Sequence, residues 1–378
     1  MDLNKTRERI DSIDSELIKL FKDRMDAVCD VARYKKENGL PIYNGQRERE
    51  VINKVVAELP EELALYAKVL YNTLFSVSRG YQTKMIDGTS QIVDKIKKAL
   101  ESTDNMMPLS AVVACQGTEG AYSQKACEKL FANPSVMYFD TFKGVLDAVS
   151  MGMCRYGILP VENSTSGTIC QVYDLMLDHK FYIVRSCLLP VQHSLLLAPG
   201  AKISDVREVI SHEQGLKQCA AYLKNLGDLK LSTAGSTALA AKKVSESGRK
   251  DVAAIASKEC AAIYSLNIAA ENIQDRDSNY TRFICISRKP EIYPASAKIS
   301  IMGSLSHKPG ALCQLLSRFA ALGINLSKIE SRPCKHENFE YMFYFDFEAS
   351  LTEPHLRNLL AGLISRENFT FLGNYSEI

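Results

Sequence analysis

The most constraining feature of the sequence is a series of apolar residues at heptad spacing near the N-terminus. It predicts one continuous helix from about Asp2 to Asn38, followed by Gly39 and Pro41, which are typical of a helix end. The apolar positions are Ile10, Ile13, Leu17, Leu20, Ala27, Val31 and Tyr34. A helix of this length cannot bury such a stripe by itself, so the pattern favours a second copy of the chain as its partner.

Cations lie within and beside this apolar stripe. Arg24 falls inside the stripe, where an unpaired charge would cost on the order of several kcal/mol. Lys35 follows at a spacing that is about 20° around the helix and about 16 Å along it, so the two side chains can converge on one small anion. Arg7 is about 42 Å from Lys35 along the same axis. If Arg7 serves this site, it comes from a second helix, which predicts a homodimer or higher homo-oligomer with shared sites.

Composition limits the classes of function. The chain has 378 residues and a net charge of +2, which allows two or three domains and gives no charge excess that points to nucleic acid. Its 11 cysteines form no CxxC pair, and we expect reduced thiols and no metal site. No apolar run is long enough to span a membrane, and the charged N-terminus lacks a signal sequence, which predicts a cytoplasmic protein.

Changes in periodicity divide the chain into domains. Residues 1–86 show only helical patterns, and residues 87–108 look like a linker with one short amphipathic helix. Residues 109–290 alternate β-branched runs with helical stretches, which predicts an α/β domain. Residues 296–378 follow a βαββαβ order, which predicts an α+β domain of the ferredoxin-like type. The predicted fold class is therefore multidomain, all-α followed by α/β and α+β.

The helical segment carries polar residues at a recognisable spacing: Arg7, Arg24, Lys35, Asn44, Arg47, Glu48, Ser78 and Gln82. Through this set it resembles the all-helical chorismate mutases. The resemblance implies that Arg7, from the partner subunit, and Arg24 clamp the two carboxylates of chorismate. It also implies that Lys35 and Gln82 face the ether oxygen and that Glu48 holds the ring hydroxyl, with Arg47 and Ser78 assisting. Enteric members of the family have Asp in place of Asn44, and we expect this difference to have a modest effect.

The residue types suit the chemistry of that family. The rearrangement of chorismate to prephenate is intramolecular and requires neither a nucleophile nor a metal, so an enzyme must hold a folded conformer and stabilise charge on the ether oxygen. Planar arginines and a point-charge lysine meet this need. We therefore expect Arg24, Lys35, Glu48 and Gln82 to act in catalysis. The plainer alternative, cations that extend to solvent, explains single residues better than the whole set.

The α/β segment contains four motifs, at residues 117–123, 159–168, 211–214 and 279–283. They resemble those of the prephenate dehydratases. The resemblance implies two α/β lobes, like those of periplasmic binding proteins, that close over prephenate, and it identifies Thr281 as the catalytic threonine. We expect prephenate to contact six residues: Ser123, Asn163, Ser164, Thr165, Thr281 and Arg282.

The dehydratase reaction needs a donor for a departing hydroxide and a dry site for a departing carboxylate. Hydroxyls and amides can orient an anion without a fixed charge, and we interpret Thr281 as a hydrogen-bond donor to the leaving oxygen. His212 and Glu162 are titratable residues of the motifs. For them the plainer alternatives are a capping histidine and an ion pair of Glu162 with Arg282. The sequence does not identify the proton donor.

Residues 297–375 resemble an ACT regulatory domain. The matching segments are Pro309-Gly310-Ala311-Leu312 at the start of a helix and Glu330-Ser331-Arg332-Pro333 at the end of a strand. In dehydratases these segments bind L-phenylalanine between paired domains, and a helix N-terminus suits a ligand carboxylate. We therefore expect the effector to contact Gly310, Ala311, Leu312, Glu330, Ser331 and Arg332. The alternative is that these are turn residues of a plain ferredoxin-like fold.

Together the resemblances predict a bifunctional chorismate mutase/prephenate dehydratase with a C-terminal ACT domain. Such an enzyme makes phenylpyruvate from chorismate for phenylalanine biosynthesis, is inhibited by L-phenylalanine, and uses neither a metal nor an organic cofactor. We expect chorismate, prephenate and L-phenylalanine as its small-molecule partners, and no nucleic acid or membrane. Two alternatives stay open: a mutase fused to an arogenate dehydratase, and a non-catalytic amino-acid sensor.

Overall fold

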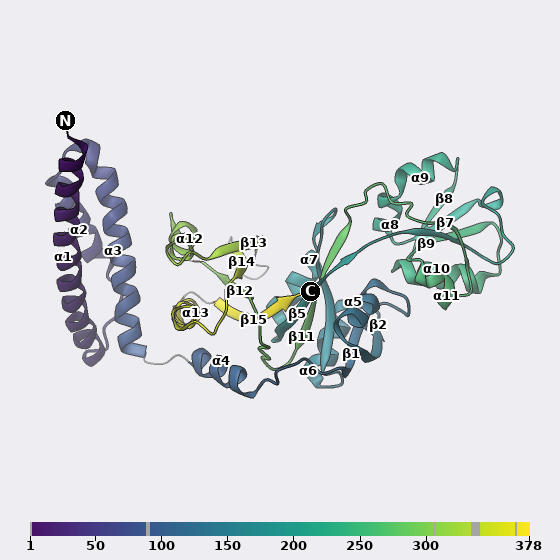
Figure 1. Cartoon of the computed structure of the whole chain (residues 1–378), viewed down its shortest axis with the longest axis horizontal. Coiled ribbons are helices and arrows are strands. Elements are labelled where there is room, and N and C mark those ends of the chain that lie inside the picture. The colour runs from purple at the N-terminus through teal and green to yellow at the C-terminus, as the bar shows by residue number, and fades with distance from the viewer. Residues whose placement is uncertain (1, 88–90, 306, 334–340, 367–368) are drawn as a thin grey trace. The chain divides into compact units, whose positions relative to one another are not determined.

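The computed structural model describes residues 2–87, 91–305, 307–333, 341–366 and 369–378 (Figure 1). Two compact units make up the chain: Met1–Lys97, Met302–Phe345 and Leu351–Thr370 form one, and Lys98–Ile301, Asp346–Ser350 and Phe371–Ile378 form the other. Of the expected linker 87–108, residues 88–90 lie outside the described residues, and Gln91–Ser102 form helix α4. The domain boundaries drawn from the sequence stay predictions.

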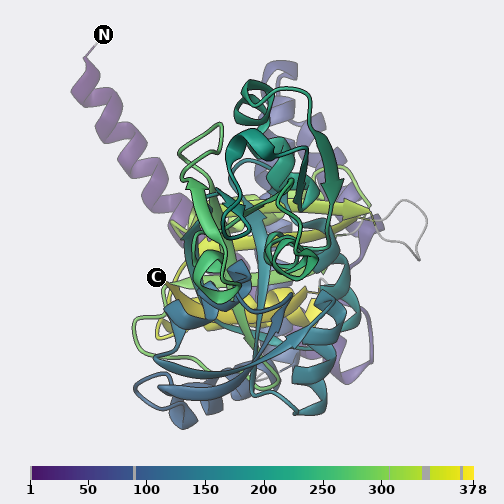
Figure 2. The same ribbon diagram turned by 90° about the vertical axis from the view of Figure 1, so that its right-hand side faces the viewer.

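Three helices form the N-terminal segment: α1 (Leu3–Glu37), α2 (Gly45–Ala57) and α3 (Glu61–Asp87). The Asp2 carboxylate caps α1 by accepting from the Asn4 amide at 3.0 Å, and Gly39 ends it in the left-handed region with a φ of 63°. Helix α1 is continuous over Leu3–Glu37, and Figure 2 shows its N-terminal part. Both α1 and α2 pack against α3. The bounds of α1 confirm the start and the end that the sequence predicted for the first helix.

The apolar stripe of α1 stays uncovered in the single chain. Leu17 and Leu20 are 54% and 64% exposed, and Leu70 of α3 is 57% exposed. Within α1, whose residues are all described, only Ala32 is buried. Soluble monomers rarely expose a contiguous apolar face of this kind, so the packing within one chain leaves the predicted stripe without a partner.

The second unit contains two α/β lobes, each built on its own sheet. The elements of the first lobe are β1 (Ser110–Gln116), α5 (Tyr122–Leu130), β2 (Asn133–Phe139), α6 (Phe142–Met151), β3 (Tyr156–Asn163), β4 (Gly167–Thr168), α7 (Cys170–Asp178), β5 (Tyr182–Pro190) and β11 (Tyr280–Ser287). The strand order is β5-β11-β3-β1-β2. Strand β1 runs parallel to β2 and β3, whereas β11 lies antiparallel between β3 and β5.

The second lobe is inserted between β5 and β11, so the chain crosses between the lobes twice. Its elements are β6 (Ser194–Leu197), the short 3-10 helix η1 (Ile203–Asp205), β7 (Glu208–Ser211), α8 (Glu213–Gln218), α9 (Ala220–Asn225), β8 (Lys230–Thr233), α10 (Thr237–Ser247), β9 (Val252–Ala256), α11 (Glu259–Ile263) and β10 (Asn267–Ala270). The strand order is β10-β6-β9-β7-β8, with an apolar cluster on each face of the sheet. The predicted two-lobed α/β architecture is thus observed, and its likeness to periplasmic binding proteins stays a prediction.

The C-terminal elements follow the predicted βαββαβ order. They are β12 (Lys298–Ser304), α12 (Ala311–Ala321), β13 (Asn325–Pro333), β14 (Tyr341–Glu348), α13 (Pro354–Arg366) and β15 (Phe369–Glu377). The strand order is β13-β14-β12-β15. At the end of β15, Ser376 and Glu377 pair in parallel with Arg185 and Ser186 of β5.

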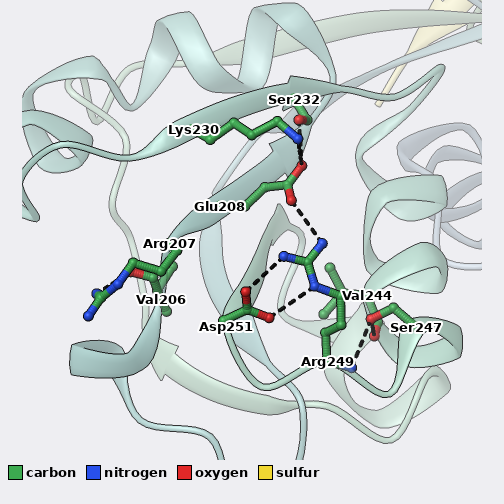
Figure 3. A network of polar contacts seen from close by, with 9 residues as sticks. All are labelled: Val206, Arg207, Glu208, Lys230, Ser232, Val244, Ser247, Arg249 and Asp251. Carbon is green, nitrogen blue, oxygen red and sulfur yellow. Dashed lines mark hydrogen bonds and ion pairs between the residues drawn. The ribbon is translucent and has the colours of Figure 1, made fainter.

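Ion pairs hold together the amino ends of β7, β8 and β9 (Figure 3). Glu208 accepts a hydrogen bond from Ser232 at 2.6 Å and lies 3.1 Å from Lys230 and 2.9 Å from Arg249. Arg249 also pairs with Asp251 at 2.8 Å. The hydrogen bond from Ser232 and the two cations lower the pKa of Glu208 to about 2. This charged network therefore lies at the end of the sheet opposite the carboxyl ends of β7 and β8.

Candidate active sites

The three N-terminal helices bring five of the predicted mutase residues together. Nη1 of Arg24 on α1 donates to Oγ of Ser78 on α3 at 2.5 Å. The Lys35 ammonium lies 3.4 Å from Oε1 of Gln82 and 2.6 Å from the Ile42 carbonyl. Ser78 and Gln82 are buried and share one face of α3 because they are four residues apart. The carboxylate of Glu48 on α2 completes the set, which we call the cationic cage.

Burial sets the electrostatics of this cage. Desolvation lowers the pKa of Lys35 below its ordinary 10.5, and the nearby Glu48 carboxylate offsets part of that shift. A bound dianion would favour the charged ammonium in the same way as Glu48. The Lys35 pKa is thus set by burial, which lowers it, and by the anions near the ammonium, which raise it.

Three predicted residues lie apart from the cage in the single chain. Asn44 caps α2, because its side chain accepts from the Arg47 amide at 3.0 Å. The Arg47 side chain is exposed and lies 3.5 Å from Glu50. Arg7 is exposed too and is about 26 Å from Arg24 along α1. One chain by itself does not place Arg7 at the cage.

Sequence reasoning missed Arg79 as a member of this region. Its guanidinium forms an ion pair with Glu48 and lies 5.6 Å from the centre of the Tyr43 ring. Its position directly after Ser78 and three residues before Gln82 could have indicated this role, because both predicted residues face the same region. Arg79 fixes the orientation of the Glu48 carboxylate.

The two lobes of the α/β domain enclose a cavity of about 660 Å³. The first lobe contributes Tyr122, Ser123, Asn163, Ser166 and Thr281, and the second lobe contributes His212, Gln214, Gln218, Ser236 and Thr237. Among the described residues that line it, none is a lysine or an arginine. The wall is instead rich in hydroxyls and side-chain amides.

Asn163 organises the first-lobe wall of this cavity. Its Oδ1 accepts from the backbone amides of Thr165 and Ser166 at 3.0 and 2.9 Å. Its Nδ2 lies 2.9 Å from Oγ1 of Thr281, 2.8 Å from Oδ1 of Asn279 and 3.1 Å from the Tyr280 carbonyl, so three acceptors share its two hydrogens. Because the Thr281 oxygen accepts from Asn163, the hydroxyl hydrogen of Thr281 remains available for donation into the cavity. This geometry supports the donor role expected for Thr281.

The structure does not place Arg282 at the cavity, contrary to the sequence-based expectation. Thr281 and Phe283 line the cavity, and alternate residues of a strand face opposite sides. Arg282 therefore points the other way, where Nη1 donates to the fully buried Asp346 at 2.6 Å and Nη2 lies 3.7 Å from Glu162. The plainer alternative for Glu162, a contact with Arg282, is the one observed.

Ser164 also differs from its expected role. Its hydroxyl donates to the Ser278 carbonyl at 3.0 Å and accepts from the Tyr280 amide at 2.9 Å. It thus fastens the loop after β3 to the start of β11 and is absent from the described cavity wall. Thr165 lies at an adjoining cavity of about 310 Å³.

Two predicted residues combine a structural bond with a place in the cavity wall. Ser123 lines the cavity and donates to the Gln116 carbonyl. His212 lines it and caps α8, because Nδ1 accepts from the Gln214 amide at 3.2 Å. The capping role was the plainer alternative for His212.

The first dehydratase motif places the loop that carries Tyr122 and Ser123. Gly120 has a φ of 83°, and a Cβ there would lie 2.8 Å from the sulfur of Cys260 on the second lobe. The Tyr264 hydroxyl donates to the Glu119 carbonyl at 2.6 Å. Glycine is required at 120 both for its backbone conformation and for this close approach.

Sequence reasoning also missed His193 and Gln218. His193 is 2% exposed, and its Nε2 lies 2.9 Å from Oε1 of Gln218. Asn279 donates to the same Gln218 oxygen at 3.1 Å. Burial lowers the pKa of His193, which favours the neutral ring. Gln218 follows Gln214 by one helical turn, which is a usable signal, whereas nothing in the sequence around His193 marks it.

A third, smaller cavity lies at the start of α12. It has a volume of about 150 Å³ and is lined by Leu305, His307, Lys308, Ala311, Leu312, Tyr341 and Phe343. Two of the predicted effector residues, Ala311 and Leu312, are in this wall, and Gly310 is the N-cap of α12. Glu330, Ser331 and Arg332 lie at the end of β13 and are outside the described wall.

Comparison with known families identifies two of these regions. Residues 113–291 match the family model for prephenate dehydratase, and residues 6–83 match the model for chorismate mutase type II. The chain is 42% identical over 280 residues to arogenate dehydratase/prephenate dehydratase 1, chloroplastic, of Arabidopsis thaliana, covering 70% of this chain and 71% of that protein. The chain belongs to the prephenate and arogenate dehydratase family. It also carries a chorismate mutase domain, so it is an enzyme with isomerase and lyase activities.

Solved structures agree with this assignment. A prephenate dehydratase from Arthrobacter aurescens, in complex with L-Phe, has a TM-score of 0.65 and 29% identity, covering 70% of this chain and 90% of that chain. GqqA, described as a novel type of quorum-quenching acylase, has a TM-score of 0.64 and 30% identity, with coverage of 71% and 98%. No helix in the described part of the chain is long and apolar enough to cross a membrane.

Proposed function

We propose that the helical domain converts chorismate to prephenate and that the cavity of the α/β domain converts prephenate to phenylpyruvate. The observation that carries this proposal is the presence of both sites in one chain. The product of the first reaction is the substrate of the second. Prephenate is therefore formed on the molecule that consumes it.

In the mutase reaction, the cage supplies charge where charge develops. The Arg24 guanidinium is held by Ser78 and binds one carboxylate of chorismate. Lys35 and Gln82 lie together and stabilise the ether oxygen as its bond to carbon breaks. Glu48, oriented by Arg79, accepts a hydrogen bond from the ring hydroxyl of chorismate. The new carbon–carbon bond forms within the same molecule, so no group on the protein exchanges a proton.

Arg7 and the uncovered stripe together support a homodimer. A second copy of α1 would cover the apolar side chains that one chain leaves exposed. It would also bring Arg7 of the second copy toward the cage. Arg24 binds one carboxylate of chorismate, and this Arg7 would bind the other. We propose that each mutase site contains residues of two chains.

In the dehydratase reaction, the ring hydroxyl and the ring carboxylate of prephenate leave together. The electron pair of the carbon–carboxylate bond enters the ring, which becomes aromatic, and the hydroxide departs on the other side. Thr281, with its oxygen accepting from Asn163, keeps its proton and donates a hydrogen bond to the oxygen that departs as hydroxide. The cavity excludes water from the departing carboxylate.

Arogenate is the second candidate substrate, because the Arabidopsis relative is named for both substrates. Arogenate carries an ammonium group where prephenate has a ketone. The linked mutase favours prephenate, since it produces that compound on the same chain. Rates measured with the two substrates on the same preparation decide between them.

We propose that residues 297–375 form an ACT domain of ferredoxin-like fold that binds L-phenylalanine and inhibits the dehydratase. The small cavity at the start of α12 supports this, because apolar and aromatic side chains surround a helix N-terminus there. The Arthrobacter aurescens dehydratase was solved in complex with L-Phe. Glu330, Ser331 and Arg332 would act from the paired domain.

One experiment tests the proposed function as a whole. Purified protein is mixed with chorismate, and prephenate and phenylpyruvate are followed over time with and without L-phenylalanine. We expect phenylpyruvate to form and to form more slowly with L-phenylalanine. Accumulation of prephenate without phenylpyruvate, followed by turnover of added arogenate, would replace prephenate by arogenate as the second substrate. An unchanged rate and no binding heat with L-phenylalanine would remove the effector site.

A further inference from the structure

We propose that His193 is a positioning residue of the dehydratase site and that it acts on Thr281 through a chain of three side-chain amides. The amides belong to Gln218, Asn279 and Asn163. This inference rests on the proposed dehydratase function and adds to it a residue that the motifs do not contain. It also fixes which atom of each side chain donates.

The direction of the chain is set at Asn163. Backbone N–H groups can only donate, so the atom that meets the amides of Thr165 and Ser166 must be the carbonyl oxygen of Asn163. Its Nδ2 is therefore the atom that faces Oδ1 of Asn279 at 2.8 Å. The two backbone donors thus decide which atom of the Asn163 amide is the oxygen and which is the nitrogen.

The same logic continues to the histidine. With Oδ1 of Asn279 accepting, its Nδ2 donates to Oε1 of Gln218 at 3.1 Å. That oxygen has no hydrogen, so the ring nitrogen of His193 that lies 2.9 Å from it must carry one. His193 is therefore protonated on Nε2. Its Nδ1 is buried and has no hydrogen-bond partner among the described residues, in keeping with a neutral ring whose second nitrogen is an acceptor.

The backbone of His193 is fixed as firmly as its ring. Its amide donates to Oε1 of Gln274 at 3.0 Å, and its carbonyl accepts from the Ile273 amide at 3.0 Å. The Tyr122 ring meets the imidazole edge-on, with 6.2 Å between the ring centres. The backbone position of His193 is therefore set by the neighbouring segment, and its ring packs between Tyr122 and Gln218.

The consequence lies at the other end of the chain. Asn163 is held by its neighbours with Nδ2 toward Oγ1 of Thr281, which leaves the threonine hydrogen for the substrate. Gln218 uses its oxygen for the chain, which leaves its amide hydrogens at the cavity that it lines. This series of hydrogen-bonded side chains joins both lobes, because His193 and Asn279 lie on the two segments in which the polypeptide crosses from one lobe to the other. The chain of side chains thus links the Asn163–Thr281 pair of the first lobe to Gln218 of the second lobe.

A pair of variants tests this role. His193→Phe keeps a planar ring without a donor, and His193→Gln restores an N–H donor. For His193→Phe we expect kcat of the dehydratase to fall about 10-fold to 100-fold, as for other losses of an orienting contact, with KM changed little. His193→Gln should recover most of kcat. Equal kcat values in wild type and His193→Phe, or equal losses in the two variants, would overturn the proposal. Because the mutase site and His193 belong to different compact units, the near-UV circular dichroism and the thermal unfolding of the same preparations report whether the α/β domain is folded.

A spectroscopic measurement is independent of activity. In the full-length protein labelled with ¹⁵N, the ring of His193, assigned by its loss in His193→Phe, should show a protonated Nε2 and an unprotonated Nδ1 at neutral pH. Asn279→Asp keeps the side-chain size but removes the donor to Gln218, and it should shift the Nε2 signal. An Nδ1–H tautomer or a doubly protonated ring would refute the chain even if no dehydratase substrate were found, whereas an inactive wild-type enzyme with the expected tautomer would refute only the proposed function.

Discussion

The two active sites of this chain surround their substrates with opposite kinds of side chain. The proposed mutase cage contains the cations Arg24 and Lys35. The wall of the dehydratase cavity, in its described part, contains amides, hydroxyls and the Asp140 carboxylate without a lysine or an arginine, and Lys217 and Arg276 line the adjoining cavity. In the mutase reaction no proton moves, so fixed charge and hydrogen-bond donors stabilise the ether oxygen. In the dehydratase reaction a carboxylate loses carbon dioxide, and a cation bound to that carboxylate would stabilise the reactant and slow the step. The presence of cations in one site and their absence from the described wall of the other thus follow from the bonds that break in each reaction.

Replacing Thr281 by Ala should have the largest effect. We expect kcat of the dehydratase to fall roughly 10³-fold, because the departing hydroxide loses its donor, while the mutase rate stays unchanged. Phenylpyruvate formation from added prephenate measures the first and prephenate formation from chorismate the second. Thr281→Ser keeps the hydroxyl and is the matched control. Near wild-type phenylpyruvate formation by Thr281→Ala would remove Thr281 from the reaction.

Replacing Lys35 by Met should have the converse effect. The variant keeps the length of the side chain but removes the charge beside Gln82, and we expect kcat/KM of the mutase to fall roughly 10²-fold to 10³-fold. Dehydratase activity on added prephenate should be unaffected. Lys36→Met, one residue along the same helix and exposed, is the control. If both variants lose the same activity, general charge rather than the cage is responsible.

The two sites should also differ in whether they are shared between chains. Arg7→Ala and Lys35→Met each inactivate the mutase if Arg7 crosses to the partner. Mixed after unfolding and refolding together, the variants should recover up to about a quarter of wild-type mutase activity, since half of the dimers contain one intact site. The same mixture of two Thr281 and Asn163 variants should recover no dehydratase activity. Absence of mutase recovery in mixed dimers would place Arg7 outside the site.

Alkaline pH should separate the sites as well. Burial lowers the pKa of Lys35 from 10.5, so its charge is lost on raising the pH before that of an ordinary lysine. We expect kcat/KM of the mutase to fall with a midpoint below pH 10.5, and kcat to fall at higher pH because the bound dianion favours the charged lysine. Dehydratase assays at the same pH values are the internal control. A mutase profile with no alkaline fall below that midpoint would contradict the assignment of Lys35.

The sequence predicted the folds of the domains better than the walls of the sites. Heptad spacing located α1 to within a residue at each end, and the βαββαβ order of the C-terminal strands is observed. The strands β2, β8 and β10 lie at sheet edges and are partly exposed, so they lack the continuous β-branched run that identifies a buried strand in a sequence. The motifs located Asn163 and Thr281 at the cavity, since these residues adjoin each other across β3 and β11.

Errors in the predicted site residues have a physical cause. A motif is contiguous in sequence, but its residues alternate between the two faces of a strand, so Arg282 lies on the face opposite Thr281. Ser164 lies in the loop after β3, close to the cavity, but its hydroxyl forms hydrogen bonds with the backbone of Ser278 and Tyr280 instead. His193 lies in a segment that meets Gln218 only through the packing of the two lobes, and no local sequence pattern indicates that contact.

The smallest expected effect concerns the ion pairs between Glu208 and two cations, Lys230 and Arg249, in the second lobe. Glu208 lies at the amino ends of β7 to β9, away from the cavity, and its pKa of about 2 is below the ordinary 4.5. Its stabilising contribution is thus complete above about pH 4.5 and disappears as the pH falls toward 2. Glu208→Gln should lower the free energy of unfolding by about 1–2 kcal/mol at pH 7, by less near pH 3, and should leave kcat of both reactions unchanged. Urea unfolding of both proteins at the two pH values measures this. A loss of dehydratase kcat at full stability would show instead that charge in the second lobe reaches the cavity, and would weaken the contrast between a mutase site with cations and a dehydratase cavity whose described wall has none.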